Sequence, residues 1–483
     1  MANVYLEKEI TIIVVLLIGF IFILIGYLNF QRFQNKVQFI VGDRDENIFS
    51  LTTTLTASAL GAWVLFGPAS AATFGGIGAV IGYSLGAATP MLLLYNFGPK
   101  IRNEFPKGLT LTQFIKKRFG ETILKLCLFL ILFYLVVFLI AEVTAIAALL
   151  NYISNIPLWL TSILTLLICL MYVLKGGFKL SLITDKYQFI FIILILVGSY
   201  FLVMHSINFS SFSIIKSNSP ILISPQNINN YTIGLTMFIA VAATNLFHQG
   251  NWQRVFSAKN NLVLKKSLIN SSIIVFLVVF WLGFSGIISI SLNDKVIPDL
   301  AFFEIILIKS NALIIILLLI LVLSLTLSTI DTLINAISSL FIIDGGKINN
   351  FFSGKDIIQK TNFTILFISL FVLIISSKGY SILYLFLLAD LICCAAVITI
   401  FFAFFKKNIN PKLAKYSISS GLIAGLLFFP SQNFENSILV GNLISKDFFH
   451  TIILNNLLFF SFLLSLLIPT IILYIYSLRN SLR

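Results

Sequence analysis

A stripe of polar side chains runs along an otherwise apolar segment between residues 320 and 340. It consists of Ser324, Ser328, Asp331, Asn335 and Ser338, which recur at steps of four, three, four and three residues. This spacing places all five side chains on one face of a helix. Oxygen atoms are the ligands that hard cations prefer, so one interpretation is an ion site. The other is hydrogen bonding between packed helices, and both stay open on the stripe alone.

Three acidic residues are isolated within or beside apolar runs. Glu142 and Asp390 each lie deep inside one, and Asp185 lies where a basic loop meets another. An ionised carboxylate in an apolar setting is costly unless it is protonated or paired with a cation. A structural role, with hydrogen bonds from Ser, Thr or backbone donors, is one interpretation of Glu142 and Asp390. A functional role in ion coupling is the other.

The composition excludes most classes of protein. Of the 483 residues, 59% are hydrophobic and 10% are charged, and the mean hydropathy is +1.03. A soluble domain carries about 25% charged residues. Only three His and four Cys are present, the latter inside apolar runs, and the sequence has no HExxH motif or visible nucleophile–base pair. The chain is therefore predicted to be a polytopic membrane protein and not an enzyme, a disulfide scaffold or a disordered chain.

Thirteen apolar runs are long enough to span a bilayer, for which a helix needs about 20 residues. No loop between them could bury a separate core, so we expect one all-α transmembrane domain over residues 1–483. The predicted spans are 8–31, 47–69, 72–96, 121–152, 157–174, 184–205, 232–256, 265–292, 305–341, 361–377, 380–405, 414–430 and 449–478.

The basic residues give an independent test of this count. With the loops numbered alternately, 26 of the 32 Lys and Arg residues fall on one side of the membrane and 6 on the other. Loops rich in Lys and Arg stay in the cytoplasm. We therefore predict a cytoplasmic-membrane protein with its N-terminus outside and its C-terminus inside. The formal net charge of +14 then reflects topology, and no nucleic-acid partner is expected.

The second predicted span combines hydroxyl groups with helix breakers. Four threonines and a serine lie within residues 52–58, and Gly67-Pro68 interrupts the run that follows. Backbone groups released inside a bilayer must face protein or a watery cavity. Interrupted helices often form binding sites in secondary transporters, and a plain turn between two spans is the alternative.

Three stretches together resemble the sodium:solute symporter family. Residues 176–188 (GGFKLSLITDKYQ) carry a double Gly, a Thr-Asp pair and a Gln, as in the family signature. Residues 328–344 resemble the family's Ser-Thr-x-Asp helix, and residues 252–259 (WQRVFSAK) resemble the Gln-Arg-containing end of its seventh span. In this order, and with thirteen spans, the resemblance covers nearly the whole chain.

The resemblance implies a leucine-transporter-type fold with a five-plus-five inverted repeat. The repeats would cover about 47–205 and 232–405, with 8–31, 414–430 and 449–478 as peripheral helices. The first helix of each repeat would be interrupted near the middle of the bilayer. Gly67-Pro68 fits this interruption in the second span, and residues 241–245 (VAATN) are the expected position in the seventh.

The resemblance also implies a sodium site between the second and ninth spans. No cofactor is expected apart from Na⁺ as the coupling ion. The matching positions are the carbonyl groups of Ala57, Leu60 and Leu325 and the hydroxyl groups of Ser328 and Thr329.

Two acidic residues are expected to act in ion coupling or gating. Asp185 matches a family aspartate linked to sodium dependence, through the inner gate rather than by direct ligation. Asp331 lies on the polar stripe close to the predicted sodium ligands.

The chain also departs from the proline-transporting branch of the family. Ala59 stands where that branch has Asp, and Ala242 and Leu246 stand about where it has Trp and Tyr. Proline is therefore not the expected solute. The missing Asp leaves room for proton coupling through Glu142 or Asp390.

These observations predict a monomeric symporter that imports a small polar solute with Na⁺. An amino acid, urea, a carboxylate, a polyamine or a sugar would fit. The alternatives are a proton-coupled transporter, a transporter-like sensor and a channel. Trp63 and Phe247 suit a core role equally well. The expected solute contacts are Trp63, Phe66, Glu142, Asn245 and Phe247.

Overall fold

The computed structural model describes residues 5–28, 36–207, 210–308, 310–352, 354, 356–406, 409–434, 436–437 and 456–481. Within these ranges the protein is helical and contains no β-strand, so the predicted all-α class is confirmed. Parts of three predicted spans, namely 29–31, 309 and 449–455, lie outside the described residues.

The helices follow one another with short connections. The first half of the chain contains α1 (Lys8–Leu28), α2 (Lys36–Val41), α3 (Ile48–Ala59), α4 (Trp63–Glu104), α5 (Leu111–Ser154), α6 (Leu158–Ser206), α7 (Ser211–Asn218) and the 3₁₀ turn η1 (Pro220–Ile223). The second half contains α8 (Ile228–Phe247), α9 (Gln249–Ser257), α10 (Asn261–Leu292), η2 (Pro298–Leu300), α11 (Ala301–Leu307), α12 (Ala312–Asp344), η3 (Gly345–Lys347), η4 (Asn350–Phe352), α13 (Ile357–Ser376), α14 (Ile382–Phe402), α15 (Pro411–Phe428) and α17 (Leu457–Ser481).

Ten helices in the described part of the chain are long and apolar enough to cross a membrane, so the protein is a multi-pass membrane protein. The predicted number of thirteen spans stays a prediction. Three helices of 42 to 49 residues are longer than one crossing needs. Each changes direction at a glycine with positive φ, namely Gly76 in α4, Gly120 in α5 and Gly177 in α6.

The first interrupted helix breaks earlier than the sequence indicated. Residues 60–62 separate α3 from α4, whereas Gly67-Pro68, the predicted break, lies inside α4. At Gly61 a Cβ atom would come within 2.5 Å of Oε1 of Glu142 and of Oγ1 of Thr329. A side chain does not fit there, so contacts distant in sequence fix the position of this break.

The second interrupted helix breaks at His248, between α8 and α9. The predicted segment, residues 241–245, is helical and lies inside α8. His248 has an extended backbone, and its Nδ1 atom accepts a hydrogen bond from the N–H of Gly250 at 3.1 Å. The imidazole thus caps α9, which is why the chain can leave the helix here without a proline.

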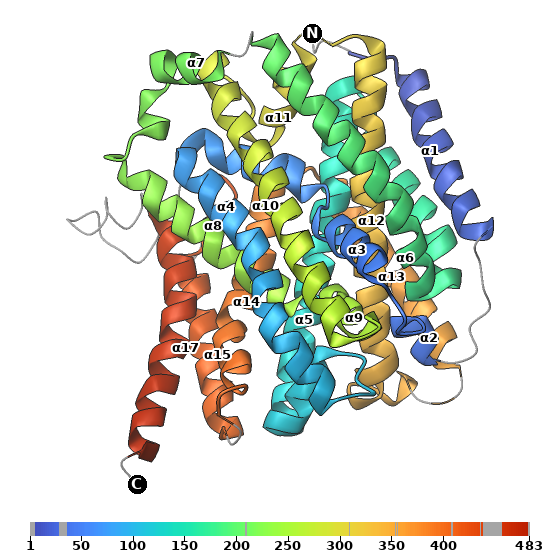
Figure 1. Cartoon of the computed structure of the whole chain (residues 1–483), viewed down its shortest axis with the longest axis vertical. Helices are drawn as coiled ribbons and strands as arrows, with labels where there is room; N and C mark the ends of the chain where they lie inside the picture. The colour runs from blue at the N-terminus through green and yellow to red at the C-terminus, as the bar shows by residue number, and fades with distance from the viewer. Residues whose placement is uncertain are drawn as a thin grey trace.

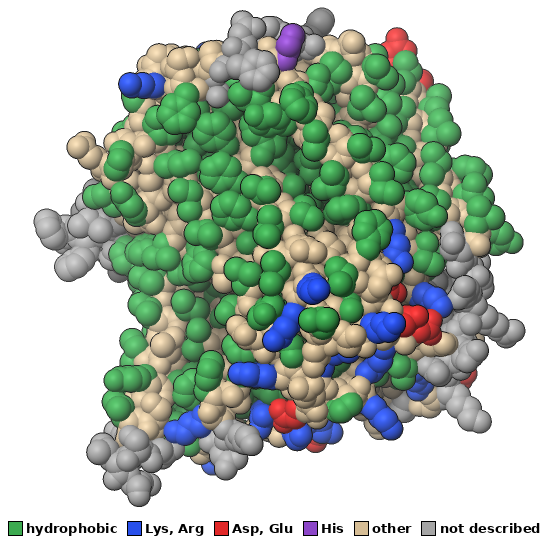
Figure 2. All heavy atoms as spheres, viewed as in Figure 1, with side chains coloured by type: hydrophobic (Ala, Val, Ile, Leu, Met, Phe, Trp, Pro, Cys, Tyr) green, Lys and Arg blue, Asp and Glu red, His purple; other side chains and the backbone are tan. Residues whose placement is uncertain are grey.

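The outer surface matches a bilayer-embedded protein. Figure 1 shows α1 at one edge of the molecule and α15 with α17 at the opposite edge. On the face in Figure 2, hydrophobic side chains cover the middle, and most Lys and Arg side chains gather toward the end where the C-terminus lies. This gathering fits the predicted charge asymmetry, and the side that faces the cytoplasm stays a prediction.

Helices α4 and α8 cross with their backbones in contact. A Cβ atom on Gly78 would lie 1.6 Å from the carbonyl oxygen of Asn230, and one on Gly82 would lie 2.0 Å from that of Gly234. Such distances are far below van der Waals contact. Small residues allow this close approach of helices in membranes, where packing rather than hydrophobic burial drives association.

Replacing Gly82 with Ala should therefore destabilise the protein by about 1–3 kcal/mol, because the added methyl group meets backbone atoms that cannot move aside independently. The measurement is thermal unfolding of the purified protein in detergent. Gly198→Ala on α6 is the control, since its Cβ would meet no atom within 4 Å. Equal unfolding midpoints for Gly82→Ala and the unmodified protein would contradict the close crossing.

Candidate ion and solute site

The break between α3 and α4 exposes backbone N–H groups at the start of α4. Glu142, on α5, meets them: its carboxylate accepts hydrogen bonds from the N–H groups of Ala62 at 2.9 Å and Trp63 at 3.3 Å. The glutamate is fully buried. A carboxylate at a helix N-terminus is favoured by the free donors and by the helix dipole. Glu142 therefore stabilises the break and links α5 to it.

The break leaves carbonyl groups at the end of α3. The N–H of Leu60 bonds to the carbonyl of Thr56 at 2.9 Å as the final turn of α3 closes. Later carbonyls, those of Ala57 and Leu60 included, have no further helical donor. These are the two predicted sodium ligands on α3, and both residues are buried.

Helix α12 packs against α3 and carries the other predicted sodium ligands. Ser328 donates its hydroxyl hydrogen to Oδ1 of Asp185 at 2.7 Å. Thr329 is buried, and its hydroxyl has no hydrogen-bond partner among the described residues. Leu325 lies one turn earlier on α12 and is fully buried. The assignment of these residues to sodium stays a prediction.

The polar stripe of α12 faces the protein interior along its whole length. Its five members are between 0 and 3% exposed. Two of their groups have no partner in the described part of the chain, the hydroxyl of Ser324 and the amide nitrogen of Asn335. A stripe that served helix packing alone would leave few such groups, because unpaired buried polar atoms are costly.

A buried ion pair lies beside the predicted sodium ligands. Nη2 of Arg254, on α9, is 2.7 Å from Oδ2 of Asp185, on α6, and neither side chain is exposed. The guanidinium also donates to the carbonyls of Thr54 and Gly250, both at 3.1 Å, and to Oγ1 of Thr332 at 3.2 Å. Arg254 therefore connects α3, α6 and α12 to the interrupted helix α9, as a gating role for Asp185 would require.

Asp331 makes a different connection between α6 and α12. Its carboxylate accepts hydrogen bonds from Ser181 at 2.7 Å and from Tyr172 and Thr184, both at 3.2 Å. All three donors are hydroxyl groups on α6. No Lys or Arg nitrogen of the described residues lies within 4 Å of this carboxylate.

A small cavity, here called the central cavity, lies between the two interrupted helices. Its volume is about 20 Å³, the space of about one water molecule. Its walls are formed by residues from α4, α5, α8 and α14 and by His248 at the break between α8 and α9. They are Trp63, Tyr83, Phe138, Val241, Thr244, Asn245, His248, Phe386 and Asp390.

The central cavity contains two of the five expected solute contacts, Trp63 and Asn245. Phe66 packs instead on Phe303, with ring centroids 4.8 Å apart, and Phe247 packs on Phe401 at 6.1 Å. Neither lines the cavity in this structure, and their role as solute contacts stays a prediction.

Asp390 lines the central cavity, whereas the sequence suggested it only as a residue for proton coupling. In the sequence Asp390 stands out only as an isolated acidic residue, because most of its neighbours in the cavity come from other helices. The hydroxyl of Thr244 on α8 donates to its Oδ1 atom at 2.6 Å. Phe138 and Phe386, which also line the cavity, give no local signal in a chain with 48 Phe residues.

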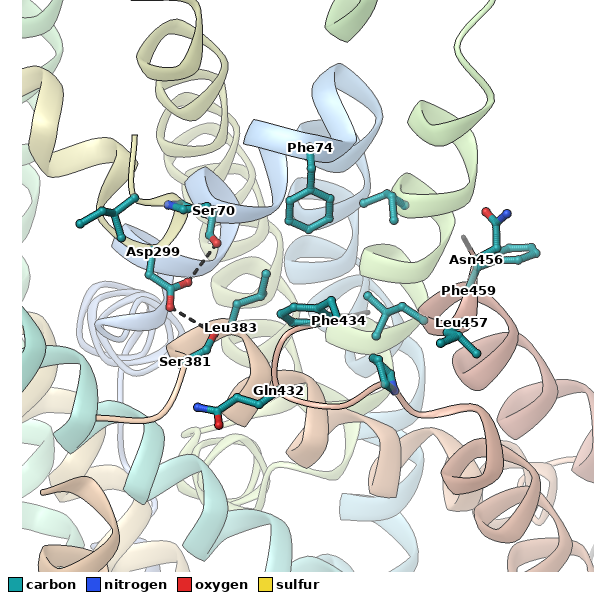
Figure 3. Close-up of a pocket in the computed structure, with 15 residues that line it drawn as sticks. Ser70, Phe74, Asp299, Ser381, Leu383, Gln432, Phe434, Asn456, Leu457 and Phe459 are labelled. Atoms are coloured by element: carbon teal, nitrogen blue, oxygen red, sulfur yellow. Dashed lines mark hydrogen bonds between the residues drawn. The ribbon is translucent and has the colours of Figure 1, made fainter. Parts of the chain in front are cut away.

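A second, larger cavity of about 410 Å³ lies near the start of α14 and the segment 430–434. Figure 3 shows Asp299 between Ser70 and Ser381 on its wall. Asp299 accepts hydrogen bonds from Ser70 at 3.0 Å, from Ser381 at 3.2 Å and from the N–H of Ile382 at 3.0 Å. It thereby caps α14, the helix that carries Asp390.

Metal ligation by acidic, His or Cys side chains finds no basis in the described residues, where no three of these side chains gather. A monovalent ion held by carbonyl and hydroxyl oxygens requires no such group.

Comparison with known proteins agrees with this geometry. The sequence model of the sodium:solute symporter family matches residues 39–421. A spermidine transporter, DUR31 of Candida albicans, is 24% identical over 382 residues, which cover 77% of this chain and 70% of that protein.

Solved structures show the same fold at low sequence identity. A Na⁺-coupled sialic acid symporter, in a substrate-bound outward-open state, has a TM-score of 0.70 at 15% identity and covers 96% of this chain and 97% of its own. Mhp1, a nucleobase-cation-symport-1 family transporter in a closed conformation, has a TM-score of 0.52 at 14% identity, with 91% and 95% coverage.

The fold and the interrupted helices therefore define a membrane transporter of the leucine-transporter type, and the inverted repeat within it stays a prediction. More narrowly, the chain belongs to the sodium:solute symporter family.

Removing one partner of the buried ion pair should destabilise the protein strongly. Asp185→Asn leaves the charge of Arg254 uncompensated, and a loss of about 3–5 kcal/mol is expected in denaturant titration of the detergent-purified protein. The double variant Asp185→Leu with Arg254→Met should recover much of this loss. Lys179→Ala, which breaks a pair with Asp43 whose side chains are about one-third exposed, is the control and should cost about 0–1 kcal/mol. A small loss for Asp185→Asn would contradict the proposed importance of the pair.

Proposed function

We propose that the protein couples Na⁺ entry to the import of a small polar organic solute across the cytoplasmic membrane. The observation that carries the proposal is the buried hydroxyl of Thr329 next to the break between α3 and α4, which has no hydrogen-bond partner among the residues that the structure describes. The solute would bind in the central cavity, where both interrupted helices meet.

The chemistry of the predicted sodium ligands supports this assignment. Ser328 gives its hydrogen to Asp185, so the lone pairs of its oxygen remain available to a cation. The Thr329 oxygen is equally available, and the C-terminal end of α3 contributes carbonyl oxygens and the negative end of a helix dipole. A cation would thus be held by Ala57, Leu60, Leu325, Ser328 and Thr329, all buried.

Coupling follows if the ion and the solute prefer the same arrangement of helices. A Na⁺ ion between α3 and α12 would stabilise the arrangement in which these helices are close. The solute would then bind at the neighbouring breaks and favour movement of one group of helices against the other. Binding shifts such an equilibrium only to the extent that affinity differs between the two states.

The related proteins support a small organic cargo. DUR31 is named as a spermidine transporter, and the structure with a TM-score of 0.70 is a sialic acid symporter. A proton-coupled transporter of the same fold is the second candidate. It is favoured by Glu142 and Asp390, two buried carboxylates without a basic partner within 4 Å among the described residues.

The sodium proposal can be tested without knowing the solute. Added NaCl should raise the thermal unfolding midpoint of the purified protein relative to the same concentration of KCl, because a ligand that binds the folded state stabilises it. Ser328→Ala combined with Thr329→Ala should increase the Na⁺ concentration for half of this effect at least about tenfold, the loss of about 1.4 kcal/mol of binding.

Ser339→Ala is the matched control on the same helix, because Ser339 bonds only to its own helix at the carbonyl of Ala336 in the described structure. An unchanged Na⁺ dependence in the double variant would overturn the site. Equal midpoints in NaCl and KCl for the unmodified protein, with uptake in proteoliposomes driven by a proton gradient alone, would favour the second candidate.

A further inference from the structure

We propose that the transported solute is an organic cation and that Asp390 pairs with its positive charge in the central cavity. This inference rests on the proposed function for the location of the solute, and it adds the chemical class and the residue that selects it.

Asp390 is a buried carboxylate with a single side-chain donor. It lies on α14, is 4% exposed and lines the central cavity. Thr244 donates one hydrogen bond at 2.6 Å. No Lys or Arg nitrogen of the described residues lies within 4 Å. A carboxylate so placed in a membrane protein is costly when ionised, and a cation beside it removes that cost.

Aromatic rings form most of the remaining wall. Trp63 and Tyr83 stack with centroids 6.1 Å apart, and Phe138 and Phe386 lie 4.8 Å apart. All four line the cavity together with Asp390. The faces of such rings attract ammonium and quaternary ammonium groups, and the attraction is larger where water is excluded.

The residues that the structure describes supply no positive charge to this cavity. His248 is its one basic lining residue, and Nδ1 of His248 accepts a hydrogen bond from Gly250, so that nitrogen carries no proton and the ring is neutral. Arg254 is held by Asp185. Glu142 does not line the cavity, but its carboxylate accepts a hydrogen bond from the backbone N–H of Trp63, which does. An anionic solute would meet only negative charge here.

The wall chemistry also separates an organic cation from a second Na⁺ ion. Desolvated Na⁺ needs several oxygen ligands. The lining offers the side-chain oxygens of Asp390, Thr244, Asn245 and Tyr83, and Thr244 already donates its hydrogen to Asp390, against the rings of Trp63, Tyr83, Phe138 and Phe386. An amine or quaternary ammonium group gains from both the carboxylate and the rings. At about 20 Å³ the cavity is too small for such a group in the structure described here. The lining helices would therefore have to move apart before an organic cation could enter and contact the rings.

The test compares charged compounds with neutral compounds of similar shape. The purified full chain in NaCl is titrated with choline and dimethylbutanol, with diaminobutane and butanediol, and with glutarate, and its thermal unfolding midpoint is recorded. At least one of the two cations should raise the midpoint, and the neutral and anionic compounds should not. Stabilisation by a neutral partner equal to that by its cation, or by glutarate alone, would overturn the proposal, as would no response to either cation.

Asp390→Asn, which keeps the size of the side chain, should weaken binding of the stabilising cation at least about tenfold and leave the Na⁺ midpoint unchanged. Asp299→Asn, the same change in the second cavity, should leave cation binding intact. Loss of binding in Asp299→Asn instead would place the cation in the second cavity and overturn the proposal. If Asp390→Asn does not fold, the comparison of charged and neutral compounds on the unmodified protein decides alone.

These outcomes are separable from failure of the proposed function. A protein that responds to organic cations but not to Na⁺ would retain the assignment of Asp390 and lose the sodium coupling. A protein that responds to Na⁺ but equally to neutral compounds would keep the coupling and lose the cation selectivity.

Discussion

The arrangement of this protein depends on one interaction, the pair of hydrogen bonds from the start of α4 to Glu142. Hydrocarbon offers no partner to a free backbone group, so a helix can be interrupted inside a membrane protein only where other groups meet its ends. The carboxylate of Glu142 meets the N–H groups of Ala62 and Trp63. Because the helix is interrupted here, the last carbonyl groups of α3 have no helical hydrogen-bond donor. Trp63, the first residue of α4, lines the central cavity.

Four buried carboxylates are stabilised in four different ways around this break. Glu142 accepts from backbone N–H groups, and Asp185 pairs with a guanidinium. Asp331 accepts from three hydroxyl groups on α6 and from that of Thr332 on its own helix. Asp390 has one hydroxyl donor and faces a cavity. Among the described residues, Asp185 is the member of this group with a basic side chain beside it, and Asp390 has the fewest hydrogen-bond donors of the four.

The sequence predicted those features that depend on local spacing. The steps of four and three residues on α12 correctly placed Ser324 through Ser338 on one buried face. The positions of the breaks could not be predicted in this way. Gly67-Pro68 is the stronger local signal, but the break occurs at Gly61 because Glu142 and Thr329 occupy the space that a side chain would need. Likewise, the choice of Phe138 and Phe386 over Phe66 and Phe247 as cavity walls depends on how distant helices pack.

The burial of Arg254 has a consequence for how the chain is assembled during synthesis. Helix α9 contains Gln249, Asn251, Gln253 and Arg254 within nine residues, and an arginine alone at the centre of a membrane helix costs about 2.5–3.5 kcal/mol on insertion. Three of its four partner residues, Thr54, Asp185 and Gly250, precede it in the chain. Thr332 on α12 follows. Most of the acceptors of Arg254, the carboxylate of Asp185 among them, are thus already synthesised when α9 leaves the ribosome, so the order of the helices allows α9 to enter the bilayer against a partner rather than alone.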